Sequence, residues 1–150
     1  MAHGVKPTWV MVCDASRARV FTFDKSHDPW TLLEDLSNPA GRARSHELVE
    51  DKAGHLGPGS QPRTDPASAE EEKFASRLGR LLETGFDGHR YGDVVLVAPP
   101  RFLGHLRASL SPPVARRVTA SIDKDLTRAD PRELRERLAD ALAGADPSPG

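Results

Sequence analysis

The spacing of hydrophobic and polar residues changes along the chain, and each change indicates a different element. The apolar run TWVMV at residues 8–12 predicts a strand that ends in a turn at residues 13–16. Residues 18–23 alternate, with Arg19, Phe21 and Phe23 on one face, and predict a second strand hairpinned to the first. Residues 30–36 predict a third strand, which is stopped by Asn38, Pro39 and Gly41. The first third of the chain is therefore predicted to form a three-stranded meander.

The remainder of the chain alternates helical and strand-like periods. A helix is predicted from Asp65 and Pro66, with an apolar stripe of Phe74, Leu78, Leu81 and Leu82. The uninterrupted run VVLVA at residues 94–98 is typical of a strand covered on both faces, so it is predicted to be the central strand. A helix at residues 99–110 follows, with Phe102, Leu103, Leu106 and Leu110 directed inward.

The last two predicted elements are a strand and a capped helix. Residues 117–122 alternate, with Val118, Ala120 and Ile122 on the inward face. Asp130 is the expected N-cap of a helix whose stripe is Leu134, Leu138, Ala141 and Leu142. The fold class is thus α/β, with the order β-β-β-loop-α-β-α-β-α. It implies one mixed β-sheet with helices packed on it, because parallel neighbours need crossover connections.

Residues 41–66 interrupt this order with a long loop rich in Gly, Pro, His and charge. Loops of this length without a periodic pattern are uncommon in compact domains and are either functional or disordered. We expect residues 1–143 to form a single domain that includes this loop, and residues 144–150 to form a flexible tail.

Composition narrows the classes of partner. The 21 basic and 22 acidic side chains leave a formal net charge of −1, so binding to RNA or a membrane needs a local charge cluster. The sequence shows no secretory signal or membrane-spanning run, and its single cysteine, Cys13, cannot form an internal disulfide, which favours a cytoplasmic protein. Motifs for nucleotide cofactors or zinc are absent, so no cofactor or metal is expected.

Five arginines could provide such a local cluster. They follow the first strand or lie in the long loop: Arg17, Arg19, Arg42, Arg44 and Arg63. Guanidinium groups bind phosphate oxygens with two hydrogen bonds, which suits an RNA backbone or another anion. The alternative is a solvated surface in which nearby carboxylates neutralise these arginines.

Three aspartates at strand ends support a different hypothesis. If Asp14, Asp123 and Asp125 met, their carboxylates could hold Mg²⁺ as in a metal-dependent nuclease. Aspartates at strand ends more commonly form turns and caps.

Three motifs carry a resemblance to a known family. They are CDASRARVF at residues 13–21, VLVAPPRFLGHLR at 95–107 and SIDKDLT at 121–127. With these motifs the chain resembles the bacterial proteins required for attachment to host cells, over residues 9–142. That family is similar in turn to the middle domain of archaeal and eukaryotic peptide release factors, which implies a related fold and a role near the ribosome.

In the release factors, a Gly-Gly-Gln loop before a long helix promotes hydrolysis of peptidyl-tRNA. The matching residues here are Gly57, Gly59, Ser60 and Gln61, with Pro58 between the glycines, so the motif is degenerate. The resemblance implies Gln61 as the candidate catalytic residue and RNA or the ribosome as the partner. The alternatives that stay open are a non-catalytic interaction protein that affects host attachment indirectly, and the metal-dependent nuclease.

Overall fold

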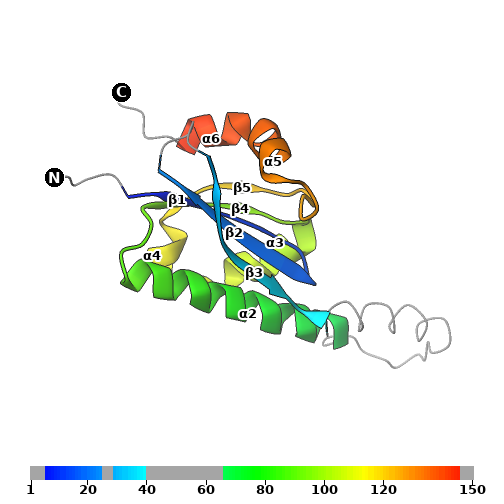
Figure 1. Cartoon of the computed structure of the whole chain (residues 1–150). Helices are drawn as coiled ribbons and strands as arrows, with labels where there is room; N and C mark the ends of the chain where they lie inside the picture. Colours follow the sequence, from blue (N-terminus) through cyan, green and yellow to red (C-terminus); the bar gives the residue numbers. More distant parts are fainter. Residues whose placement is uncertain (1–5, 25–28, 40–65, 146–150) are drawn as a thin grey trace.

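A five-stranded mixed sheet forms the centre of the protein, with helices on both faces (Figure 1). The computed structural model describes residues 6–24, 29–39 and 66–145. The strands are β1 (Thr8–Cys13), β2 (Arg17–Phe23), β3 (Thr31–Ser37), β4 (Asp93–Val97) and β5 (Val118–Ile122). The helices are α2 (Pro66–Asp87), α3 (Pro100–Ala108), α4 (Pro112–Ala115), α5 (Pro131–Arg137) and α6 (Ala139–Ala145).

The strand order in the sheet is β3-β2-β1-β4-β5. β2 is antiparallel to both β1 and β3, as predicted for the meander. β4 is parallel to both β1 and β5, as the crossover connections require. The α/β class, the mixed sheet and the order of the predicted elements are therefore confirmed.

The run at residues 94–98 is buried on both faces, as predicted, and all five of its side chains are inaccessible to solvent. The middle strand is nevertheless β1, with β4 beside it. The hairpin places β2 on one side of β1, so the strand that returns through α2 pairs on the other side. Both interior strands have continuous apolar sequences because helices cover both faces.

Alternation along the strands divides the core into two clusters. One contains Met11, Val20 and Leu96 and packs under the apolar stripes of α2 and α3. The other contains Val12, Phe21 and Val97 and packs under Leu134 of α5, Leu142 of α6 and Leu138 between the two helices. Figure 1 shows α2, α3 and α4 on one face of the sheet and α5 and α6 on the other. The predicted helix stripes are therefore the residues that build these layers.

Local irregularities account for the differences from the sequence prediction. The register between β4 and β5 shifts after Val94, so Val118 packs on the α2 side while Ala120 and Ile122 face α5 and α6. The prediction that Val118, Ala120 and Ile122 share one face of β5 is therefore wrong. The prediction also missed the short helix α4.

The last helix is divided at Leu138, whose φ of −103° and ψ of 9° leave the helical region. Asp130 is confirmed as the N-cap, and its side chain accepts a hydrogen bond of 2.8 Å from the Glu133 N–H. Helix α6 extends to Ala145, and residues 146–150 of the predicted tail lie outside the described residues.

The predicted loop at 41–66 lies outside the described residues except for Pro66, which starts α2. Arg42, Arg44, Gly57, Gly59, Ser60, Gln61 and Arg63 lie outside them as well. None of the helices in the described part of the chain is long and apolar enough to cross a membrane.

Candidate functional site

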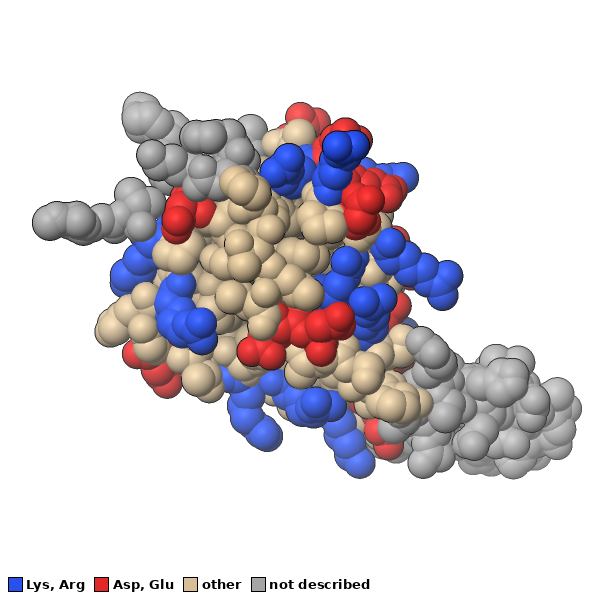
Figure 2. Space-filling model, viewed as in Figure 1, with Lys and Arg blue, Asp and Glu red and all other residues tan. Residues whose placement is uncertain are grey.

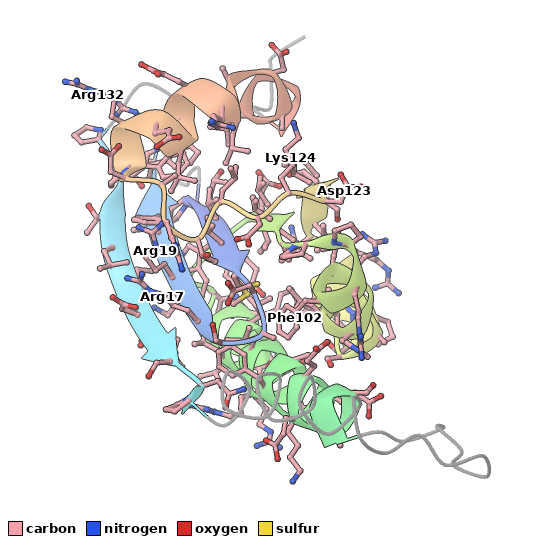
Figure 3. All side chains as sticks on the ribbon, turned by 90° about the vertical axis from the view of Figure 1, so that its right-hand side faces the viewer. Arg17, Arg19, Phe102, Asp123, Lys124 and Arg132 are labelled. Carbon is pink, nitrogen blue, oxygen red and sulfur yellow. The ribbon has the colours of Figure 1, made fainter. Side chains whose placement is uncertain are left out.

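The carboxyl ends of the parallel strands β1, β4 and β5 meet at one end of the sheet (Figures 1 and 3). In open α/β sheets, ligands bind at this end, where neighbouring strands connect in opposite directions. β1 continues into β2 on one side, and β4 continues through α3 to β5 on the other. β3 ends and α2 begins at the same end (Figure 1), so residues 40–65 leave and rejoin the described fold there.

Asp14 organises the turn between β1 and β2. Its Oδ1 accepts hydrogen bonds from the Ser16 N–H at 2.8 Å and the Arg17 N–H at 2.9 Å. Asn38, which is buried at the end of β3, donates from Nδ2 to the Ala15 carbonyl at 3.0 Å. These bonds fix the turn and the exit of β3 in one rigid unit, because they satisfy polar groups that the fold buries.

Thr127 joins this turn to the segment that follows β5. Its Oγ1 lies 3.2 Å from Asp14 Oδ2 and 3.0 Å from Asp125 Oδ1. A hydroxyl has one hydrogen, so it donates to one carboxylate at a time. Asp123 is exposed and makes none of these contacts.

The three-aspartate metal site, which the sequence left open as an alternative, does not form among the described residues. Within residues 6–24, 29–39 and 66–145, no group of three or more His, Cys, Asp or Glu side chains could hold a metal ion. Asp14 and Asp125 instead act as a turn former and a loop cap, which is the ordinary role of aspartates after strands.

Arg17 and Arg19 have different roles although both lie on β2. Arg17 is exposed, and its Nε is 3.4 Å from Asp35 Oδ1. Arg19 is only 9% exposed, and its guanidinium donates to the carbonyls of Leu126, at 3.5 Å, and Ala129, at 2.5 Å. Burial, followed by repulsion from Arg17, lowers the pKa of Arg19.

Arg19 is therefore buried rather than displayed beside Arg17 on the surface, and its role in anion binding stays a prediction. It holds the segment between β5 and α5 against the sheet (Figure 3). The sequence did contain a signal for this position, because Arg19 alternates with Phe21 and Phe23 on the apolar face of the strand. A long charged side chain on that face is expected to find buried partners.

The sequence did not indicate an ion-pair cluster between α2 and α3, in which Glu71 contacts a cation and a histidine. Glu71 Oε1 lies 3.3 Å from Arg101 Nε and 3.5 Å from His105 Nε2. Glu71 lies in the second turn of α2 and Arg101 in the first turn of α3, and both helices begin at the strand-end site. These contacts join residues about 30 positions apart, so no local spacing indicated them.

Cys13 ends β1 beneath this site but is fully buried. Its Sγ is 3.8 Å from the Val97 carbonyl oxygen. Burial, and then the charge of Asp14, raise the pKa of the thiol. A thiol that does not ionise is a poor nucleophile, so Cys13 acts as a small apolar core residue.

The exposed charges at this end are mixed. Arg101 and Lys124 are exposed cations, and the exposed anions Asp123 and Asp125 flank Lys124 in the sequence. On the face shown in Figure 2, blue and red side chains are interspersed around a central area of uncharged residues. The described residues at this end therefore form a polar site in which positive and negative charges largely balance.

Comparisons with known proteins identify the family. A family model described as "Protein required for attachment to host cells" matches residues 9–138. Among curated proteins there is no match. Two solved structures are similar at low identity: archaeal translation termination factor aRF1, with 10% identity and a TM-score of 0.42, and an archaeal protein, with 9% identity and a TM-score of 0.46.

Each of these two comparisons covers 91% of this chain. The same alignments cover 39% of aRF1 and 38% of the other protein, so this chain matches well under half of either. The family match spans most of the chain, including β1 to β5 and α5. The chain therefore belongs to the family of proteins required for attachment to host cells.

Proposed function

We propose that this protein is a translation-associated domain that binds RNA or the ribosome at the carboxyl end of its parallel strands. One observation carries the proposal: β3 ends and α2 begins at that end, beside the Asp14 turn and the start of α3. The segment between them contains the cations Arg42, Arg44 and Arg63 and the Gly-Pro-Gly-Ser-Gln sequence at 57–61. Both attachment points of this segment lie at the end of the sheet where α/β folds bind ligands, which supports the proposal.

Exposed cations on the described part of the site can add to this group. Arg17 pairs with Asp35, and Arg101 pairs with Glu71, and both guanidiniums are more than 40% exposed. Exposed ion pairs are worth ~0–1 kcal/mol, so a phosphate can replace the carboxylate partner at little cost. The interface would thus be local, which agrees with the net charge of −1.

The test is ribosome co-sedimentation together with binding of single-stranded RNA as a function of salt. Replacing Arg42, Arg44 and Arg63 by Gln is expected to lower the slope of log affinity against log salt by about 2, since each phosphate contributes ~0.7. A matched control replaces Arg77, Arg80 and Arg116, which lie on α2 and after α4, and should keep the wild-type slope. Equal losses in both variants, or no binding at low salt, would exclude the proposed interface.

Hydrolysis of peptidyl-tRNA is the activity proposed for this site. An amide side chain and a neighbouring backbone N–H can orient the attacking water and stabilise the developing oxyanion. Gln61→Ala should then remove hydrolysis while leaving ribosome binding intact. If the wild-type protein binds ribosomes without hydrolysis, the domain is a non-catalytic interaction module. The exposed Leu32 on edge strand β3, which is 48% accessible, favours that second role.

A further inference from the structure

A cavity of about 330 Å³ lies between the middle of α2 and the link from α3 to α4. It opens to solvent and is lined by Ser76, Gly79, Arg80, Glu83, Ser109, Leu110 and Ser111. Gly79 is 13 residues into α2, or roughly 20 Å from the helix start at 1.5 Å per residue. The cavity is therefore separate from the strand-end site.

Close backbone packing fixes the floor of the cavity. A Cβ added at Gly79 would lie 2.7 Å from the carbonyl oxygen of Ser109, so only glycine lets α2 approach the link this closely. Ser109 is held in turn by a hydrogen bond of 3.0 Å from its Oγ to the His105 carbonyl. The walls thus exist before any ligand binds, which is the usual condition of small-molecule sites.

Ser111 supplies a buried hydroxyl without a partner. It occupies the N-cap position of α4 but its side chain makes no capping hydrogen bond. Among the described residues its Oγ has no hydrogen-bond partner although it is buried. A buried hydroxyl without a hydrogen-bond partner destabilises a fold. The Ser111 hydroxyl has three staggered positions about the Cα–Cβ bond. After the hydroxyl rotates to another of these positions, a polar ligand atom in the cavity can complete the missing bond.

Two opposite charges line the same cavity. Arg80 and Glu83 are one turn apart on α2, and within the described chain no ion pair joins them or engages either with a third residue. The lining is therefore neutral in sum but strongly polar. Glu83 would repel a phosphate, whereas a ligand with both an anionic and a cationic group satisfies both side chains.

We propose that this cavity binds a small zwitterion of the α-amino acid type. The ligand carboxylate pairs with Arg80 and accepts the hydroxyl hydrogen of Ser111, while its ammonium group pairs with Glu83. An apolar ligand side chain packs on Leu110, which is half-buried in the wall. Because the cavity is small and open, the affinity is on the order of millimolar.

The test is an NMR titration of the ¹⁵N-labelled full chain with L-leucine. Saturable shifts are expected in residues 76–83 and 109–111. N-acetyl-L-leucine lacks the ammonium group and L-leucine amide lacks the carboxylate, so each should bind at least about tenfold more weakly. Equal binding of either analogue would overturn the zwitterion assignment, and the absence of saturable shifts with L-leucine would overturn the site itself.

Variants separate ligand contacts from structural roles. Arg80→Gln and Glu83→Gln should each weaken L-leucine binding about tenfold or more. Arg77→Gln, on the same helix but outside the cavity, should leave it unchanged. Ser111→Ala should weaken binding without lowering stability, because its hydroxyl caps nothing in the free protein. Unchanged affinity in Arg80→Gln or Glu83→Gln would refute the proposal.

Discussion

Arg19→Met is expected to destabilise the protein by about 1.5–3 kcal/mol, the range for a hydrogen bond to a charged group. Methionine retains the apolar stem but cannot donate to the Ala129 carbonyl, which the guanidinium contacts at 2.5 Å. The Leu126 carbonyl still accepts from the Ala129 N–H at 3.1 Å, so the penalty comes mainly from the Ala129 oxygen. Urea denaturation measures the total loss of unfolding free energy. Hydrogen exchange at residues 126–130 should show faster local opening.

Arg17→Met is the matched control, since it removes the same group two positions earlier on β2. Arg17 and Asp35 are 41% and 46% exposed, so losing their ion pair should cost ~0–1 kcal/mol. Equal destabilisation by the two variants would show that the guanidinium of Arg19 does not anchor the segment after β5. A large effect confined to Arg19 would show that this segment is held by the sheet.

The core of the fold could be read from the sequence because burial leaves a periodic signal. The stripe from Phe74 to Leu82 and the run at 94–98 are each repeated often enough to define an element and its covered faces. Asp130 was equally predictable, because N-caps depend on residues three apart in sequence. These features rest on local interactions or on simple alternation.

Features that depend on distant partners could not be read in this way. The register shift after Val94 arises from pairing between β4 and β5, and it reverses the face of Val118 relative to Ala120. The break at Leu138 also leaves no clear signal in the sequence. The helical spacing is kept across it, because the Leu142 N–H donates to the Leu138 carbonyl at 2.8 Å. One continuous helix and two consecutive ones have the same apolar stripe.

The candidate site shows the same limit. Asp14 and Asp125 do approach one residue, but that residue is Thr127, which the metal-site hypothesis did not include. Glu71 and His105 meet only because α2 and α3 pack side by side. The sequence indicated that these aspartates lie at strand ends, while the partner of each residue is set by tertiary packing.

Gly85→Ala is expected to destabilise the protein by about 2 kcal/mol, within the range for overpacking a core. The added methyl carbon would lie 2.7 Å from Trp9 Cη2, 2.9 Å from Trp9 Cζ3 and 3.0 Å from Tyr91 Cε2. Neither ring has room to move, because both are buried and their centroids are 4.8 Å apart.

The Tyr91 ring is further fixed by its hydroxyl, which donates to the Leu82 carbonyl at 2.6 Å. Burial raises the pKa of Tyr91 to about 12, so this donor is retained throughout the neutral range. The methyl group at residue 85 must therefore displace α2 from the sheet, and the cost should appear as a lower urea midpoint.

Gly104→Ala adds the same methyl group to a helix with the opposite expected result. A Cβ at Gly104 has no atom within 4 Å beyond its own helix, and the residue is exposed on α3. Alanine should stabilise this helix by about 1 kcal/mol, because it restricts the unfolded chain and has the higher helix propensity. The two variants should thus differ by about 3 kcal/mol in unfolding free energy, and a similar gain in both would show that the Trp9 and Tyr91 rings yield without cost.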